Sequence, residues 1–594
     1  MKKRIEKRQQ TNKMNHRKRT AIALVLAAAC VSMSGCGVLE DALSELEWQL
    51  DQNRTAKSSL SIENDTEPEI LDDGLTYAEE AEYESFYLAG AVPATYAAAK
   101  GYGDDESVYP DWNTEEYSYQ EENPWMSVKT SPFSTFAADV DTASYANLRR
   151  MILRGERIPA DAVRIEEMIN YFSYDYPEPQ EGEPFSVTTE LAPCPWNKAT
   201  KLLLIGLKAK KLEESERPAS NLVFLVDVSG SMDEYNKLPL VQQSMHLLTE
   251  NLGPDDRISI VTYADGDEVV LEGVSGENRA KISAAMEDLM AGGGTNGSAG
   301  IQTAYEIAEK NFIPGGNNRI ILATDGDLNI GITDEGSLTR LIQEKAKSGV
   351  YLSVLGFGTG NISDTNMEAL ADHGNGNYSY IDSVAEARKV LIEEMGQTLY
   401  TVAKDVKLQV EFNPEKIKGY RLIGYENRTM AAEDFADDTK DGGEIGAGHR
   451  VTALYEIADI NSDQEIPEVA SRYGNSGKTE DAVQPEEENM DEDMTEIPVT
   501  QDEMLAVNIR CKDPDGEESR LLTYPVESSQ EAETMSENLS WAAGVAQAGM
   551  LLKDSKYSGT SGYEEIIERL QTLDSSATDD YRQEFLYLLK RLKV

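Results

Sequence analysis

The chain has 594 residues, of which 40% are hydrophobic, and this length predicts more than one domain. The 55 Lys and Arg residues against 107 Asp and Glu give a formal net charge of -52, and so acidic a chain excludes nucleic acid as a partner. With only four Cys and four scattered His, a disulfide scaffold and a zinc site are also excluded, so any bound metal should have oxygen ligands.

The first 35 residues have the pattern of an export signal. A basic start leads into the short apolar run AIALVLAAACVSM and then into small residues. The ending Ser34-Gly35-Cys36 resembles the lipobox of bacterial lipoproteins, although Met33 stands where Leu is usual. The resemblance implies lipidation of Cys36 and an exported protein anchored to the extracytoplasmic face of the cell membrane or to an outer membrane. An ordinary cleaved signal with an incidental cysteine is the alternative.

Two regions follow the signal. Residues 36–122 are acidic and lack regular hydrophobic periodicity, which predicts a disordered tether. Residues 123–217 are expected to form a helix-plus-β region, because their apolar period changes from that of a helix to that of a strand. The expected elements are helices at Thr142–Arg154 and Ala160–Phe172, then strands at Phe185–Leu191 and Lys201–Leu207.

Residues 218–403 alternate between strands and amphipathic helices. Continuous apolar strands bounded by polar loops predict a doubly wound α/β domain with a mostly parallel, Rossmann-like sheet. The last helix is expected from Val384 to about Thr401. The expected strands are Leu222–Val226, Ile258–Tyr263, Ile320–Ala323 and Tyr351–Gly356.

Residues 404–530 are predicted to be β-rich, with an acidic disordered insertion at 461–503, and residues 531–594 to be helical. The expected strands are Lys404–Phe412, Arg421–Glu426, Arg450–Ile457, Met504–Arg510 and Arg520–Val526, and the expected helices are Leu539–Leu552, Tyr563–Leu573 and Asp579–Leu592. A lone hairpin is barely stable in water. We therefore expect one β-sandwich built from both sides of the α/β domain, which would be inserted between Leu207 and Lys404. Cys194 and Cys511 would then share a domain, either paired or as free thiols.

Polar side chains follow the predicted strands at one edge of the sheet. The first strand leads into Asp227-Val228-Ser229-Gly230-Ser231, and a later strand leads into Asp325. The segment Gly292-Gly293-Gly294-Thr295-Asn296 opens a helix between them. Loops at the carboxyl ends of strands in a doubly wound sheet converge. These hydroxyls and carboxylates are therefore expected to form a site for a hard, oxygen-bound cation.

The motifs DVSGSM, GGGTN and ATDGD resemble the von Willebrand factor type A domain and its metal-ion-dependent adhesion site. The resemblance implies direct ligation by Ser229, Ser231 and Thr295, and acidic positions at Asp227 and Asp325. It also implies Mg²⁺, with Mn²⁺ or Ca²⁺ as alternatives, and a protein partner whose Glu or Asp completes the metal shell. Less specifically, the flanks resemble bacterial lipoproteins with a central A domain.

The resulting functional hypothesis is a membrane-anchored adhesion or scaffold protein without enzymatic activity. The sequence contains no GxSxG elbow, zinc set or complete phosphate loop. The segment Asp139-Val140-Asp141-Thr142-Ala143 is similar to a dehalogenase nucleophile motif, but Ala143 breaks it, so we interpret it as a helix start capped by Asp141 or Thr142. The alternatives are a non-catalytic subunit of an envelope enzyme or ATPase-linked complex, and a hydrolase of unrecognised type.

Overall fold

A computed structural model describes residues 114–593, except 213–216, 296, 327–334, 395, 397–398, 441, 468–498, 515, 517 and 561. The chain divides into two compact units, Met1–Glu82 and Tyr83–Val594, and all described residues belong to the second. The expected signal, the lipidation site Cys36 and the tether up to residue 113 lie outside the described residues.

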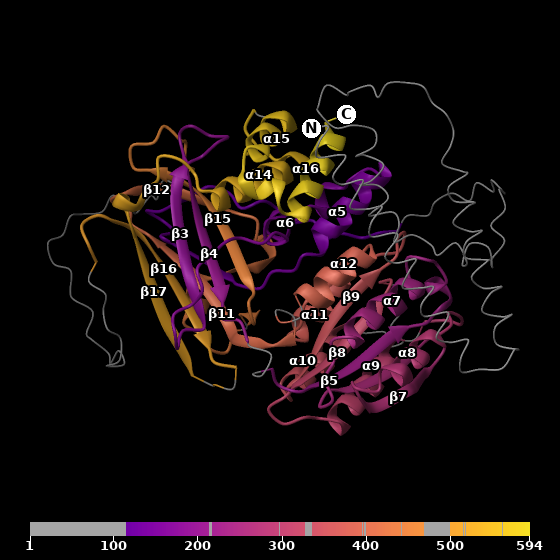
Figure 1. The fold of residues 1–594 in the computed structure, drawn as a ribbon. Coiled ribbons are helices and arrows are strands. Elements are labelled where there is room, and N and C mark those ends of the chain that lie inside the picture. Colours follow the sequence, from indigo (N-terminus) through magenta and orange to yellow (C-terminus); the bar gives the residue numbers. More distant parts are fainter. Residues whose placement is uncertain are drawn as a thin grey trace, which may run out of the picture. The chain divides into compact units, whose positions relative to one another are not determined.

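The described strands of the central domain form a six-stranded sheet in the order β10-β9-β8-β5-β6-β7 (Figure 1). All neighbours run parallel except β6 and β7, which are antiparallel. The doubly wound, mostly parallel architecture is thus confirmed. The strands are β5 (Ser220–Asp227), β6 (Arg257–Tyr263), β7 (Asp267–Ser275), β8 (Asn317–Thr324), β9 (Val350–Phe357) and β10 (Tyr378–Ile381).

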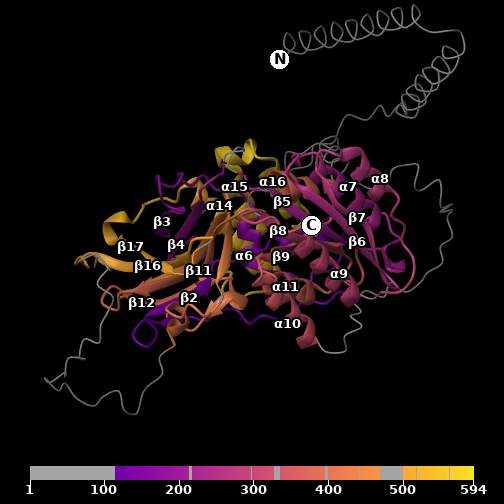
Figure 2. The ribbon, with the colours of Figure 1, turned by 90° about the horizontal axis from the view of Figure 1, so that it is seen from below.

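Helices cover both faces of this sheet, which explains why its inner strands are continuously apolar. On one face, α7 (Leu238–Thr249), α8 (Arg279–Glu287) and α12 (Val384–Arg388) contribute to one hydrophobic core. On the other face, α9 (Gly297–Lys310), α10 (Glu335–Ala346) and α11 (Asp364–His373) contribute to a second. Figure 2 shows α7 and α8 on the opposite side of the strands from α9, α10 and α11.

Two antiparallel sheets make up the β-region, and strands from both sides of the central domain enter each of them. One has the order β1-β12-β15-β4-β3, and the other β13-β2-β11-β16-β17, with β14 paired to β11. Tyr420 and Tyr455 of the first sheet donate hydrogen bonds to Phe133 O and Ser134 Oγ of the second. The shared β-sandwich is therefore confirmed. Its strands are β1 (Met126–Ser127), β2 (Phe133–Ala137), β3 (Phe185–Pro193), β4 (Lys201–Ala209), β11 (Thr401–Phe412), β12 (Ile417–Ile423), β13 (Thr429–Met430), β14 (Gly443–Gly446), β15 (Arg450–Asp459), β16 (Glu503–Lys512) and β17 (Ser519–Glu527).

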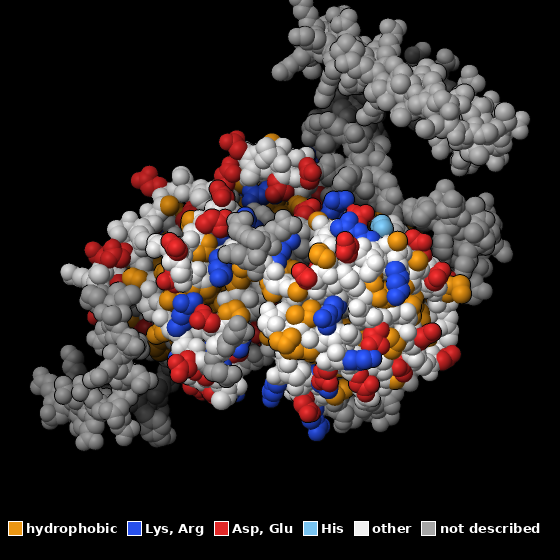
Figure 3. Space-filling view, turned by 60° about the horizontal axis from the view of Figure 1, so that its bottom comes forward, with side chains coloured by type: hydrophobic (Ala, Val, Ile, Leu, Met, Phe, Trp, Pro, Cys, Tyr) orange, Lys and Arg blue, Asp and Glu red, His pale blue; other side chains and the backbone are white. Residues whose placement is uncertain are grey.

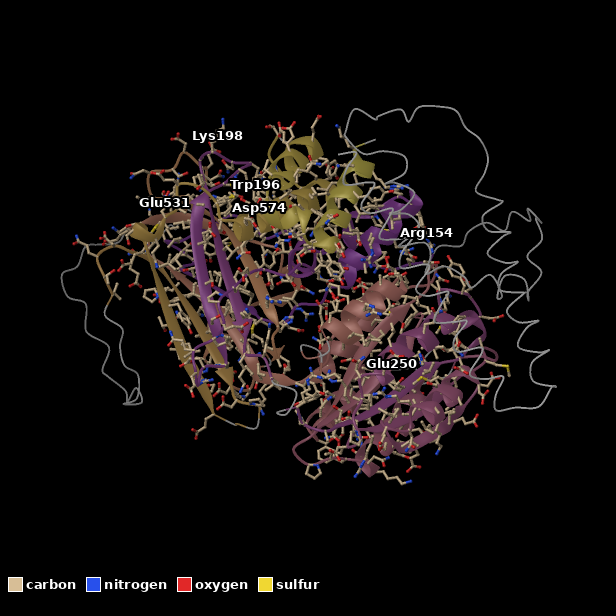
Figure 4. All side chains as sticks on the ribbon, viewed as in Figure 1. Arg154, Trp196, Lys198, Glu250, Glu531 and Asp574 are labelled. Atoms are coloured by element: carbon tan, nitrogen blue, oxygen red, sulfur yellow. The ribbon has the colours of Figure 1, made fainter. Side chains whose placement is uncertain are left out.

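Helices cover the outer face of the first sheet. Leu203 and Ile205 of β4 face the sandwich core, whereas Leu202 and Leu204 face the helices. The helices are α5 (Ala143–Arg154), α6 (Ile165–Asn170), α14 (Glu537–Leu552), α15 (Tyr563–Gln571) and α16 (Asp580–Leu592). Figure 4 labels Trp196 beside these helices, and this side chain belongs to their core. The expected C-terminal helical region is present with boundaries within two residues.

Two expected helices are shorter than the sequence pattern indicates. The segment 160–172 is split into a 3-10 turn at Ala160–Ala162 and α6, because Val163 and Arg164 are extended. The guanidinium of Arg164 reaches Asp364 and Glu368 from this break, at 3.0 and 2.8 Å. The helix expected from Val384 to about Thr401 consists of α12 followed by a π-helical turn at Lys389–Glu393. At Thr401 the chain already belongs to β11.

Other boundaries also differ. The strand expected at Arg421–Glu426 is β12, which ends at Ile423 because Gly424 and Tyr425 adopt left-handed φ values of 75° and 61°. The proposed tether runs too far, since Thr114 N and Glu116 N donate hydrogen bonds to Gly360 O and Ile362 O. The proposed insertion 461–503 also begins too early, because residues 461–467 are placed and Ser462 Oγ donates to Ala199 O.

Cys194 and Cys511 do not pair. Both are buried free thiols, and they belong to different hydrophobic cores. Burial raises the pKa of both thiols, which keeps them protonated and unreactive at neutral pH.

On the face seen in Figure 3, acidic, basic and hydrophobic side chains are interspersed. Among the described helices, none combines the length and the apolar character needed to cross a bilayer.

Candidate functional site

The predicted site lies at the carboxyl edge of the central sheet. Asp227 is the last residue of β5, and Asp325 follows β8, the neighbouring parallel strand. A short 3-10 turn at Gly230–Met232 carries Ser231 and directs the chain toward α7. The two acids, 98 positions apart in the printed numbering, therefore meet because their strands are adjacent and parallel.

Asp227 is fully buried and accepts hydrogen bonds at both carboxylate oxygens. Its Oδ1 accepts from the backbone N–H of Ser229 at 2.9 Å. Its Oδ2 accepts from the hydroxyls of Tyr263 and Thr324 at 3.1 and 3.3 Å. These contacts fix the carboxylate at the end of β5, as expected of a group that must be oriented toward a ligand.

The two serines connect the two acids. Ser229 Oγ lies 3.0 Å from Ser231 Oγ, and the Ser231 side chain hydrogen-bonds to Asp325. Ser229 is buried, and Ser231 is partly exposed. The Ser229 side chain also hydrogen-bonds to Asp227. Side-chain hydrogen bonds therefore link four of the five predicted ligands, and the set is open to solvent on the side of Ser231.

Thr295, the fifth predicted ligand, is partly exposed in the loop before α9. This loop is fastened to the Asp227 loop by two backbone hydrogen bonds, from Gly230 N to Gly293 O at 3.0 Å and from Gly292 N to Val228 O at 2.8 Å. Gly293 has a φ of +86°, and a Cβ on it would lie 2.7 Å from Asp265 Oδ2. Glycine is therefore required at this position of the loop that contains Thr295.

The two buried acids have opposite electrostatic environments. Burial raises the pKa of Asp227 to about 6, and the charge of Asp325 adds to the rise. Burial acts in the same direction on Asp325, but the charge of the Lys237 ammonium and the hydrogen bonds from Asn361, Ser231 and Lys237 together outweigh it. As a result, the pKa of Asp325 lies below its ordinary value.

Lys237 and Asn361 belong to the site and were not found by sequence reasoning. Lys237 Nζ donates to Asp325 Oδ2 at 3.0 Å and to Asn361 Oδ1 at 3.2 Å. Lys237 directly precedes α7, where a lysine is ordinarily solvated, and Asn361 lies in the loop between β9 and α11. Nothing in the spacing of these residues indicates that they meet at Asp325.

The donor set fits a hard divalent cation, because carboxylate and hydroxyl oxygens are what Mg²⁺, Mn²⁺ and Ca²⁺ prefer. Within the described part of the chain, no three or more His, Cys, Asp or Glu side chains are grouped to hold a metal. A cation here would thus depend on the hydroxyls as well as on Asp227 and Asp325.

The segment similar to a dehalogenase motif, residues 139–143, leads into α5. Thr142 is the N-cap residue of α5, which confirms the expected helix start, but its side chain makes no capping hydrogen bond. Asp141 Oδ1 instead accepts from Tyr378 N at 2.8 Å, and Arg428 Nη2 lies 3.2 Å from Asp141 Oδ2. His246 is exposed on α7.

Family models match three consecutive parts of the chain: the region before the central domain, the central domain itself, and the region after it. A model of the von Willebrand factor type A domain matches residues 221–393. A model described as von Willebrand factor matches residues 111–204, and one described as "Uncharacterized protein YfbK, C-terminal" matches residues 397–594.

Two curated proteins and one solved structure are similar to this chain. The chain is 40% identical over 516 residues to "Uncharacterized protein YfbK" of Escherichia coli K12, covering 86% of this chain and 84% of that protein. It is 32% identical over 188 residues to "Uncharacterized protein sll0103" of Synechocystis, covering 31% of this chain and 43% of that protein. A solved structure, "von Willebrand factor type A from Catenulispora acidiphila", aligns at 14% identity with a TM-score of 0.37, covering 80% of this chain and 92% of the other.

The similarity to the Escherichia coli protein thus covers more than four fifths of each chain. The chain therefore belongs to the YfbK family, and its central domain is a von Willebrand factor type A domain.

Proposed function

We propose that this protein is a non-catalytic, lipid-anchored protein of the cell exterior that binds a protein partner through a divalent cation. The observation that supports the proposal most directly is the set of side-chain hydrogen bonds that links Asp227 through Ser229 and Ser231 to Asp325. The cation would be held by these residues and Thr295, with Mg²⁺ proposed first and Mn²⁺ or Ca²⁺ as alternatives. When bound, the cation supplies a Lewis-acidic position for an acidic side chain of the partner.

The chain's own residues prepare this position. Hydrogen bonds from Tyr263 and Thr324 hold Asp227 Oδ2, which limits the movement of this carboxylate when a ligand arrives. The partly exposed Ser231 and Thr295 leave one side of the site open to a partner. An oriented site with one open side is suited to recognition of an external carboxylate.

Calorimetry on the whole protein tests the cation. Asp227→Ala should abolish divalent binding, because it removes a charged ligand. Ser229→Ala should weaken binding less, because it removes a neutral one. The matched controls are Asp256→Ala, at the opposite end of the sheet, where Asp256 accepts from Ser220 N, and Ser244→Ala, a buried serine of α7. Undiminished binding by Asp227→Ala would refute the assignment.

Two further experiments test the partner and the anchor. A pull-down with the whole protein should recover a partner in Mg²⁺ and lose it with chelator or with Asp227→Ala. For the anchor, Cys36→Ser should release the protein from membranes or leave its signal uncleaved. Unchanged detergent-dependent membrane partition of Cys36→Ser would refute lipidation while leaving the metal site untouched.

A further inference from the structure

Lys237 is a buried cation built into the site. Only 3% of its side chain is exposed, and its Nζ lies 3.0 Å from Asp325 Oδ2. Its aliphatic part packs over Gly358, where an added Cβ would lie 2.4 Å from Lys237 Cε. Together with the hydrogen bond to Asn361 Oδ1 at 3.2 Å, this packing holds the ammonium in place beside the acid.

The lysine changes the charge balance of the buried site. Asp227 and Asp325 are both fully buried, so the ionised cluster that these two acids form with Lys237 in the described part of the chain carries one net negative charge. A divalent cation would turn this into one net positive charge, and one external carboxylate would then bring the cluster to neutrality. Without the lysine, the divalent cation alone would neutralise the two acids. Glu234, 3.9 Å from Lys237 but 55% exposed, is screened by water.

An uncompensated charge in a buried site is costly, so the neutral state is favoured. We infer that Lys237 makes cation binding depend on an acidic ligand. Its charge weakens the binding of the cation alone and strengthens the binding of a carboxylate to the site that holds the cation. This inference rests on the proposed function, since it concerns the same site. It identifies the ligand class as a single carboxylate with no further negative charge entering the buried cluster.

Binding of Mn²⁺ to the full-length protein, followed by electron paramagnetic resonance, tests the inference with acetate as the carboxylate probe. In chloride buffer, Lys237→Met should bind Mn²⁺ about tenfold more tightly than the unaltered protein, because a repulsive charge is removed. Replacing chloride by acetate at constant ionic strength should tighten Mn²⁺ binding to the unaltered protein and leave Lys237→Met unchanged.

Three variants control the result. Lys237→Arg keeps the charge and should behave like the unaltered protein, whereas Lys237→Gln is a second neutral form should the Met variant fold poorly. Lys389→Met removes another buried lysine, which pairs with Glu394 at 2.5 Å, and should leave Mn²⁺ affinity unchanged.

The outcomes separate this inference from the function on which it rests. If the unaltered protein binds Mn²⁺ and Asp227→Ala does not, but the folded neutral variants bind no more tightly than the unaltered protein, only the role of Lys237 is overturned. An equal acetate effect in the unaltered and neutral proteins overturns it as well. If the unaltered protein binds no Mn²⁺ in either buffer, the metal-dependent function and the role of Lys237 fall together.

Discussion

Arg149 joins three regions of the chain through a buried cluster of acids. It lies on α5, and its Nη2 is 2.5 Å from Asp382 Oδ1 and 2.8 Å from Glu386 Oε2, both in the von Willebrand factor type A domain. Its Nη1 is 3.3 Å from Glu584 Oε1 on the last helix. The Arg149, Glu386 and Glu584 side chains are each 1% exposed. Arg149→Met would leave three carboxylates without the guanidinium that compensates them.

Removing one partner of a buried ion pair costs about 3–5 kcal/mol of stability, whereas removing one partner of an exposed pair costs at most about 1 kcal/mol. We therefore expect Arg149→Met to lower the free energy of unfolding by about 3–5 kcal/mol, a large part of the usual 5–15 kcal/mol. Urea denaturation followed by circular dichroism and tryptophan fluorescence would measure it. The matched control is Lys310→Met, which breaks an ion pair between Lys310 and Glu272 whose side chains are 63% and 37% exposed.

A second substitution checks the cause. Adding Glu386→Gln to Arg149→Met removes one uncompensated charge, so the double variant should recover part of the lost stability. The reasoning is refuted if Arg149→Met is no more destabilising than Lys310→Met. It is also refuted if the double variant is no more stable than Arg149→Met alone.

Three further predictions concern the β-sandwich. A Cβ on Gly206 would lie 2.3 Å from Tyr176 Cζ, so Gly206→Ala should cost about 1–3 kcal/mol in urea denaturation. Gly266→Ala, where nothing lies within 4 Å, is its control, and equal effects would contradict the packing argument. Burial, with repulsion from Arg450 and Lys389, lowers the pKa of His449 to about 4. Because the unfolded chain binds a proton near pH 6.5 and the folded chain does not, this histidine costs stability as pH falls from about 6.5 toward 4. Between pH 7 and pH 5 the unaltered protein should lose about 2 kcal/mol more than His449→Gln, and equal losses would refute the shift. Finally, residues 404–594 alone should not unfold cooperatively in circular dichroism, because β11 pairs with β2 and β15 pairs with β4, both from before residue 404. A fragment as stable as the whole protein would show that the sandwich does not need those strands.

Local pattern was sufficient for elements whose environment is uniform along their length. The strand β5 is buried at every position, and its apolar run predicted it within two residues. The central helices α7 and α9 have amphipathic periods, which a single buried face produces. The meeting of Asp227, Ser229, Ser231 and Asp325 follows from the same reasoning, because parallel strands in a doubly wound sheet end at one edge. Ligation of a metal by these residues and by Thr295 stays a prediction.

Edge strands and interrupted elements were not predictable in this way. The antiparallel strand β7 was missed because much of it is exposed, so its sequence lacks a continuous apolar run. The strand β2 was missed because it has only five residues and its partner β11 lies more than 260 positions away. The break before α6 likewise depends on Arg164 reaching Asp364, which local propensity cannot register.

The sequence by itself thus determined the domain order, the parallel sheet and the set of oxygen donors, since each depends on residues close together in the chain or on a rule of topology. Only the tertiary structure decided what surrounds those donors. Lys237 meets Asp325 across 88 positions, and Arg149 meets Glu584 across 435. The position of a charged residue in the sequence does not predict its ion-pair partner. The electrostatic state of the site therefore follows from the folded arrangement alone.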